Sequence, residues 1–269
     1  LTWRVNVVGG TRLFRAAVEA GVRTIVHASS VGAYSPGPKD TPVDEGWPTD
    51  GWPTAAYTRE KAYLERVLDR IESEQPGVRV VRLRPGFIFK RETGAEQRRL
   101  FIGPFLPNRL VRPALVPVVP DLPGLRFQVV HSLDVADAFR RAAVGDVRGA
   151  FNVATDPVVD AQQLARLLGA RTVRLPARAA RAAVAAAWQL RLTPASPHLF
   201  DALLRVPIMS TERARCELGW QPQHDALATL EEFLGGLRDG AGAGTPPLSP
   251  RTGGPLRSHE VATGVGGRP

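Results

Sequence analysis

The chain has 269 residues, 43% of them hydrophobic, and a formal net charge of +9 at pH 7. This length and apolar content suit one or two globular domains with a substantial core. A single cysteine, Cys216, excludes an internal disulfide and a cysteine metal cluster. The longest apolar run, Ala182 to Leu190, is far shorter than the about 20 residues that a membrane span needs.

The basic charge is the feature that would indicate nucleic-acid binding. Only three of the 35 basic residues are lysines (Lys39, Lys61 and Lys90), and the arginines are spread along the chain without a dense run. We therefore expect no nucleic-acid partner, although a basic surface would help to attract an anionic cofactor or substrate. The chain begins with Leu and has no charged-then-apolar leader, so we expect a cytoplasmic protein whose natural start is missing.

The first predicted helix covers residues 3–20, where apolar side chains recur at helical spacing, and Gly21 is suited to cap its C-terminus. Residues 22–29 are short, rich in β-branched side chains and almost uncharged, which predicts a strand buried on both faces. Residues 35–54 contain five prolines and predict a loop.

Helical spacing returns over residues 55–75, and a second β-branched strand follows over 78–85. The alternation of helix and strand predicts an α/β fold with a parallel sheet and crossover helices. In such sheets functional groups gather at the carboxyl ends of the strands. Ser29 and Ser30 lie at one such end, and the Arg84-Pro85-Gly86 turn lies at another.

The second half of the chain predicts a smaller lobe and a tail. Residues 87–126 carry six prolines after position 100 and predict an irregular lid or lobe segment. From about Asp239 the chain is poor in large apolar residues and predicts a disordered tail. The remaining predicted elements are strands at 127–132 and 149–154, a helix at 177–191, and helices capped by Asp134, Asp160, Ser210 and Asp225.

Tyr57 and Lys61 lie four residues apart at the start of a predicted helix and therefore share a face. An ammonium group near Tyr57 would lower the pKa of the phenol from about 10. Tyr57 could then exchange a proton with a carbonyl or alcohol oxygen, which the Ser30 hydroxyl could also hold. Lys61 could donate hydrogen bonds to a cofactor ribose. This set suits hydride transfer with a nicotinamide, although a bare Y-x-x-x-K pattern is common.

The order of several short segments resembles the extended short-chain dehydrogenases/reductases, in the NAD-dependent epimerase/dehydratase family. The resemblance runs from residue 3 to about 237. It implies a doubly wound, Rossmann-like parallel sheet, a smaller C-terminal substrate lobe, NAD or NADP as cofactor and no metal. The matching segments are Asn6-Val7-Val8-Gly9, 20–34 (AGVRTIVHASSVGAY), Glu45, 57–65 (YTREKAYLE), 81–86 (VRLRPG), 131–139 (HSLDVADAF), 151–154 (FNVA) and 210–222 (STERARCELGWQP).

The resemblance also implies residue roles. Tyr57 would be the catalytic acid/base, Lys61 would bind the ribose and tune Tyr57, and Ser30 would orient the substrate. Phe87 would contact the substrate together with Ser30. The further positions implied near the cofactor are Asn6, Ser29, Pro85 and Gly86. A small-molecule substrate and a homodimer that pairs through two helices are implied as partners. His131, Trp220 and Pro222 are expected to be structural.

The chain departs from the family at the cofactor loop, because Gly9-Gly10 falls in a predicted helix and no G-x-x-G-x-x-G precedes it. We expect an N-terminally truncated fold that lacks roughly 60–80 residues of two βα units. Residues 1–86 would be the remainder of the dinucleotide-binding domain, with help from strands near 127–132 and 149–154. Residues 87–238 would be mainly the substrate lobe, and 239–269 the tail.

Three functions remain open. The first is epimerase or dehydratase chemistry on a nucleotide sugar. Phe87 stands where many such enzymes carry Asn, Ser35 replaces a Gly, and the usual Arg is out of register at Arg126. These departures weaken a sugar-nucleotide substrate, although the order of the family segments still favours it. The second is a reductase or dehydrogenase of a steroid-like or other small apolar ketone or alcohol, which Phe87 and Phe127 motivate because they would make the pocket more apolar. The third is a non-catalytic remnant. A hydrolase triad of Ser30, His131 and Asp134 is disfavoured, since no G-x-S-x-G surrounds Ser30.

Overall fold

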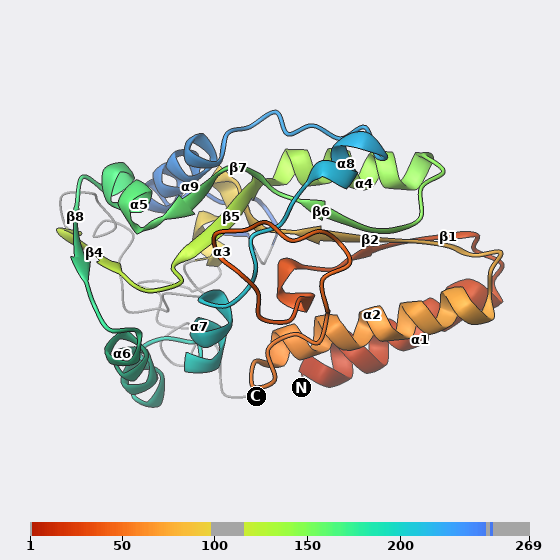
Figure 1. Cartoon of the computed structure of the whole chain (residues 1–269), viewed down its shortest axis with the longest axis horizontal. Coiled ribbons are helices and arrows are strands. Elements are labelled where there is room, and N and C mark those ends of the chain that lie inside the picture. The colour runs from red at the N-terminus through yellow and green to blue at the C-terminus, as the bar shows by residue number, and fades with distance from the viewer. Residues whose placement is uncertain (1, 98–115, 246–247, 250–269) are drawn as a thin grey trace. The chain divides into compact units, whose positions relative to one another are not determined.

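The computed structural model describes residues 2–97, 116–245 and 248–249 (Figure 1). Two compact units make up the chain. Unit 1 consists of Leu1–Ile88, Phe127–Val158 and Arg205–His224. Unit 2 consists of Phe89–Arg126, Val159–Leu204 and Asp225–Pro269. The candidate site lies in unit 1.

Unit 1 is built on a parallel sheet of three strands in the order β1-β2-β6. These strands are β1 (Thr24–Ala28), β2 (Arg79–Pro85) and β6 (Gly149–Val153). Helices α1 (Gly10–Glu19) and α2 (Ala56–Glu74) lie on one face, and α4 (Ser132–Val144) and α8 (Glu212–Cys216) lie on the other (Figure 1). The predicted doubly wound α/β fold is therefore confirmed.

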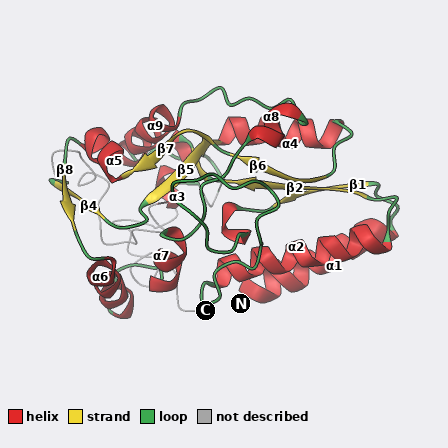
Figure 2. Cartoon of the chain, in the orientation of Figure 1, coloured by secondary structure: helices red, strands yellow, loops and turns green. Residues whose placement is uncertain are grey.

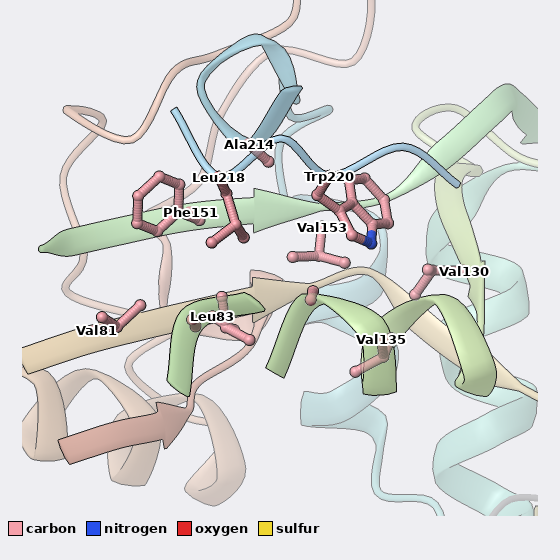
Figure 3. Close-up of a cluster of buried hydrophobic side chains, with 11 residues drawn as sticks. Val81, Leu83, Val130, Val135, Phe151, Val153, Ala214, Leu218 and Trp220 are labelled. Carbon is pink, nitrogen blue, oxygen red and sulfur yellow. The ribbon is translucent and has the colours of Figure 1, made fainter. Parts of the chain in front are cut away.

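Each face of this sheet has its own apolar core, because successive side chains of β2 point to opposite faces. Val80 packs toward α1 and α2, whereas Val81 and Leu83 pack toward α4 and α8. The first core contains Phe14, Ile25, Leu64, Leu68, Ile71, Val78 and Val80. The second, shown in Figure 3, contains Val81, Leu83, Val130, Val135, Ala138, Ala142, Phe151, Val153, Ala214, Leu218 and Trp220.

The remaining described strands form two smaller sheets; Figure 2 shows all strands in yellow. One has the order β3-β5-β7 and consists of β3 (Phe87–Phe89), β5 (Arg126–His131) and β7 (Thr155–Asp160). The other pairs β4 (Val118–Asp121) in parallel with β8 (Arg171–Arg174). The remaining α-helices are α3 (Gly94–Gln97), α5 (Ala161–Leu168), α6 (Ala177–Gln189), α7 (Pro197–Leu203) and α9 (Ala226–Asp239).

Most predicted elements are confirmed within a few residues. The helix expected over 3–20 is a π-helical segment, Arg4–Gly9, followed by α1. The predicted strand 78–85 is β2, in which all seven residues are buried. Asp160 and Asp225 cap α5 and α9 as expected, since each carboxylate accepts two backbone N–H bonds. Short 3-10 helices, Val31–Ala33 and Arg91–Thr93, were not predicted.

Several expectations are wrong for reasons of tertiary structure. β1 is not buried on both faces: only Ile25 is buried in it, because β1 is the outer strand of the described sheet. The N-cap of α4 is His131 rather than Asp134, and the N-cap of α8 is Thr211 rather than Ser210. The segment 87–126 contains β3, α3 and β4, although 98–115 lie outside the described residues, as does most of the expected tail.

Among the residues that the structure describes, no helix has both the length and the hydropathy required to span a membrane.

Candidate active site

Three residues on one face of α2 meet three consecutive residues at the carboxyl end of β1. Positions 57, 61 and 65 follow one another at intervals of four, so their side chains share a face of the helix. The Lys61 ammonium group donates to the Ala28 carbonyl oxygen at 2.7 Å. The Ser29 hydroxyl donates to the Glu65 carboxylate at 2.5 Å, and the Ser30 hydroxyl lies close enough to the Tyr57 phenol to favour its ionised form. Tyr57, Lys61 and Ser30 are therefore brought together, as the sequence predicted.

The turn after β1 fixes the Ser30 side chain. Ser30 Oγ accepts a hydrogen bond from the Gly32 backbone N–H at 3.0 Å and so caps the 3-10 helix Val31–Ala33. A Cβ at Gly32 would lie 3.2 Å from Tyr57 Cε1 and 3.4 Å from Ser30 Oγ. The first of these distances is tighter than most real contacts of a Cβ atom, so a side chain here would require the Tyr57 ring to shift by a few tenths of an ångström.

The environment of Tyr57 differs from the expected one. Burial raises the pKa of the Tyr57 phenol, and the neighbouring Ser30 hydroxyl only partly opposes this. The Lys61 ammonium lies 5.7 Å from the centroid of the Tyr57 ring and is bonded to Ala28. The expectation that Lys61 lowers the pKa of Tyr57 is therefore wrong for the chain without a cofactor. A protonated phenol at neutral pH is suited to donate a proton.

Burial lowers the pKa of Lys61, and the carboxylates of Glu60 and Glu65 oppose that change. Glu60 is itself buried and accepts a hydrogen bond from the Asn6 amide at 2.8 Å. The resemblance places Asn6 near the cofactor. Asn6 is exposed in the structure, and its amide is hydrogen-bonded to Glu60, the residue before Lys61. The acidic neighbours favour the charged form of Lys61 in a partly buried position.

A buried polar network connects this face of α2 with β2 and β6. The Arg84 guanidinium binds both Glu65 oxygens, at 2.9 and 2.5 Å, and donates to the Tyr34 hydroxyl at 2.9 Å. The Tyr34 hydroxyl donates to Asn152 Oδ1 at 2.7 Å, and burial raises the pKa of Tyr34 to about 12. Sequence reasoning missed Glu65, although its position eight residues after Tyr57 and the arginines on a buried strand were available signals.

The other predicted residues lie at the carboxyl end of β2. The Gly86 N–H donates to the Val153 carbonyl at 2.9 Å, and a Cβ at Gly86 would lie 2.6 Å from the Gln128 carbonyl oxygen. Gly86 therefore permits close packing on β5, and Pro85 pairs with Val153 in the sheet register. The Phe87 ring contacts Phe127 edge to face, with centroids 5.4 Å apart.

His131 and Asp134 have structural partners. The His131 ring stacks on His224 at 3.9 Å, and the Asp134 carboxylate accepts backbone N–H bonds from Gln223 and His224. The buried Trp220 indole donates to the Asp134 carbonyl at 2.8 Å. These contacts explain why Asp134 does not cap α4, and they leave the hydrolase reading without support.

The residues present fit the nicotinamide-ribose end of a dinucleotide. Lys61 spends one of its three N–H donors on Ala28, so two remain for ribose hydroxyls. Although the surrounding protein shields the Tyr57 phenol enough to raise its pKa, 46% of the residue is exposed to solvent, so it can reach a bound molecule. Gly9 and Gly10 have helical φ angles of −64° and −59°, so they form no phosphate-binding turn. No cluster of metal-binding side chains occurs in the described part of the chain.

Relatives of this chain occur in several bacteria. Uncharacterized proteins of Mycobacterium bovis and Mycobacterium tuberculosis are each 26% identical over 246 residues, which cover 86% of this chain and 59% of theirs. The chain thus spans about three fifths of the length of these relatives. A 4-hydroxy-2-methyl-3-oxo-4-farnesyl-3,4-dihydroquinoline-1-oxide ketoreductase of Stigmatella aurantiaca is 27% identical over 257 residues, covering 90% and 72%.

Solved structures share the fold at lower identity. A Thermus thermophilus UDP-glucose 4-epimerase in complex with NAD is similar with a TM-score of 0.61 and 20% identity, covering 88% of this chain and 70% of that one. The dTDP-glucose 4,6-dehydratase DesIV of Streptomyces venezuelae has a TM-score of 0.58 and 17% identity, covering 87% and 66%.

The sequence itself identifies the family. Residues 1–154, more than half of the chain, match the sequence profile of the "NAD dependent epimerase/dehydratase family". The matched region contains β1, α2, β2 and β6, and with them Tyr57, Lys61 and Ser30. The chain therefore belongs to the NAD-dependent epimerase/dehydratase family.

Proposed function

We propose that this chain carries the acid/base half of an NAD(P)-dependent oxidoreductase site, with Tyr57 as catalytic acid/base, Lys61 as ribose ligand and Ser30 as substrate-orienting residue. The observation that carries the proposal is the meeting of the carboxyl end of β1 with one face of α2, where Ser30 and the Ala28 carbonyl contact Tyr57 and Lys61. This edge of a parallel sheet is where active groups gather.

Each residue then has a defined task. A nicotinamide, when bound, gives or takes the hydride. Tyr57 donates its phenolic proton to the substrate carbonyl oxygen, or removes the proton of an alcohol in the reverse direction. The Ser30 hydroxyl donates a hydrogen bond to the same oxygen as negative charge develops there. The Lys61 ammonium, held at the end of β1 by the Ala28 carbonyl, donates to the ribose hydroxyls.

A small apolar ketone or alcohol is the substrate class that we favour. Phe87 and Phe127 form an aromatic pair at the end of β2, the position that the family resemblance assigns to substrate contact. The Stigmatella aurantiaca relative, whose name describes a ketoreductase of a farnesyl-bearing quinoline, supports the same class at 27% identity. A nucleotide sugar is the second candidate, supported by the fold shared with UDP-glucose 4-epimerase and dTDP-glucose dehydratase.

Turnover measurements with the protein that contains this chain test the proposal. NADH and NADPH are each supplied with a panel of apolar ketones, and NAD with UDP- and dTDP-hexoses. We expect nicotinamide oxidation with an apolar ketone and none with the sugars. Conversion of a hexose instead would transfer the assignment to the second candidate. If calorimetry detects no cofactor binding and no substrate is turned over, the hypothesis of a non-catalytic remnant would be favoured.

A further inference from the structure

Glu65 is a completely buried acid that no step of the proposed reaction uses. Its side chain is 0% exposed, and its carboxylate is bound by the polar side chains of Ser29 and Arg84. One carboxylate oxygen accepts from Ser29 Oγ and Arg84 Nε, and the other accepts from Arg84 Nη2. Although burial raises the pKa of Glu65, the hydrogen bonds and charge of Arg84 outweigh it and hold the pKa below its usual range.

A buried ion pair of this kind is weak evidence for stability. Removing two charges from water costs several kcal/mol for each ion, and apolar replacements of similar volume are often as stable. The contacts of Glu65 therefore need another explanation. Its most specific contact is the bond from Ser29, because that bond joins α2 to the end of β1, 36 residues away in the sequence.

The position of Ser29 determines what its two neighbours can reach. The carbonyl oxygen of Ala28, which precedes it, accepts a hydrogen bond from Lys61. The hydroxyl of Ser30, which follows it, lies beside Tyr57. Ser29 is thus the central one of three consecutive contacts with one face of α2. Fixing its hydroxyl on Glu65 fixes the spacing of the other two contacts. The second oxygen of Glu65, held by Arg84, prevents the carboxylate from turning away.

Glu65 also contributes charge to the site. It is one helical turn beyond Lys61, and its carboxylate is one of the two that oppose the effect of burial on the Lys61 ammonium. Arg84 neutralises part of this effect, since it binds both oxygens of Glu65. The Glu65 carboxylate thus holds Ser29 by a hydrogen bond and acts on Lys61 through its charge.

We propose that Glu65 is a positioning residue of the Tyr57–Lys61 site, holding Ser29 so that Ser30 and the Ala28 carbonyl meet Tyr57 and Lys61. This inference rests on the proposed function for its catalytic consequence. Its structural consequence, the environment of Lys61, is measurable without turnover.

The same helix and strand offer a matched control. Arg82 of β2 is also buried and binds two acids of α2, Asp69 at 2.9 Å and Glu72 at 2.7 Å. This second bridge joins the same two elements, and within the described part of the chain its hydrogen bonds and ion pairs do not reach residues 28–30. Substituting Glu72→Gln therefore removes a charge from the α2–β2 contact without touching the candidate site, whereas Glu65→Gln removes one inside it.

The first experiment observes Lys61 directly by carbon NMR of protein labelled at the lysine side chains. With only three lysines in the chain, Lys39 and Lys90 serve as internal references. We expect Glu65→Gln to lower the pKa of Lys61 by about 0.5 unit or more, since an opposing carboxylate is lost. Glu72→Gln is expected to leave it unchanged. An unchanged Lys61 pKa and chemical shift in a folded Glu65→Gln protein would overturn the proposal.

A second variant avoids the risk that Glu65→Gln does not fold. Ser29→Ala removes the Ser29–Glu65 bond but keeps the Arg84–Glu65 pair. We expect it to shift the Lys61 NMR signals and to lower kcat about 10-fold or more, with a smaller change in KM, because displaced catalytic groups lose rate. Wild-type kcat and Lys61 signals in Ser29→Ala would contradict the proposal. If the wild-type protein shows no turnover, the proposed function fails, and the Lys61 titration still decides whether Glu65 organises this site.

Discussion

The two faces of the β1-β2-β6 sheet have different tasks. The face covered by α4 and α8 is an apolar core closed by Trp220, whose one polar atom is satisfied by the Asp134 carbonyl (Figure 3). The face covered by α1 and α2 has an apolar core as well, but at the strand ends it changes to charged and hydroxyl groups. The α4 and α8 face thus contributes mainly apolar packing, whereas the α1 and α2 face also carries the polar groups of the candidate site at the strand ends.

The largest expected effect concerns the α4 and α8 face. Trp220 is 0% exposed and fills this core. Trp220→Ala should lower the free energy of unfolding by about 3–5 kcal/mol, since it leaves a cavity and removes the hydrogen bond from the indole to the Asp134 carbonyl. Urea unfolding measures this, with Leu13→Ala, a 67% exposed residue, expected to cost below about 0.5 kcal/mol. Equal losses in the two variants would refute the placement of the core.

A pH dependence is expected from the α1 and α2 face. The His27 ring lies edge to face against Phe14, and burial, followed by the charge of Lys61, lowers the pKa of His27 to about 4. Between pH 6.5 and about 4, His27 is protonated in the unfolded chain but remains neutral in the folded chain. Stability should therefore be complete above pH 6.5 and fall as the pH is lowered to about 4, by up to about 3 kcal/mol.

Urea midpoints recorded across this pH range test the sign and the residue. His27→Phe keeps a ring against Phe14 and removes the titrating group, so the loss of stability between pH 6.5 and 4 should be smaller in this variant. An identical pH profile in wild type and variant would assign the effect to other groups.

A smaller effect is expected at the turn after β1. Gly32→Ala would place a Cβ 3.2 Å from Tyr57 Cε1, and the ring must shift to accept it. We expect a stability loss of about 1 kcal/mol and a larger fractional loss of kcat. Gly77→Ala is the control, because a Cβ there has no neighbour within 4 Å. A Gly32→Ala protein with wild-type kcat would show that Tyr57 does not need its present position.

Local patterns were enough to predict α2 and β2. The helical spacing over 55–75 and the β-branched run over 78–85 place both elements within a residue or two of their observed bounds. The shared face of Tyr57 and Lys61 follows from the helix alone. The position of Ser30 beside them follows from the rule that parallel strands present their carboxyl ends at one edge.

Long-range contacts explain what could not be predicted. Asp134 is a good N-cap by sequence, but the backbone of residues 223 and 224 takes its carboxylate, and His131 caps α4 instead. The partners of Glu65 are Ser29, which follows β1, and Arg84, which lies on β2, and neither is visible in the spacing of α2. The raised pKa of Tyr57 likewise depends on burial, which a helical wheel does not contain.

One comparison of two tyrosines on α2 tests the central claim most directly. Tyr57 and Tyr63 are 46% and 47% exposed, but only Tyr57 contacts Ser30, whereas Tyr63 packs against Trp3. In the protein that contains this chain, Tyr57→Phe should lower kcat about 100-fold or more, because the acid/base group is lost. Tyr63→Phe should keep kcat within about 2-fold, since no proton transfer is assigned to it. Equal kcat values for the two variants would contradict the assignment of Tyr57 as the catalytic acid/base.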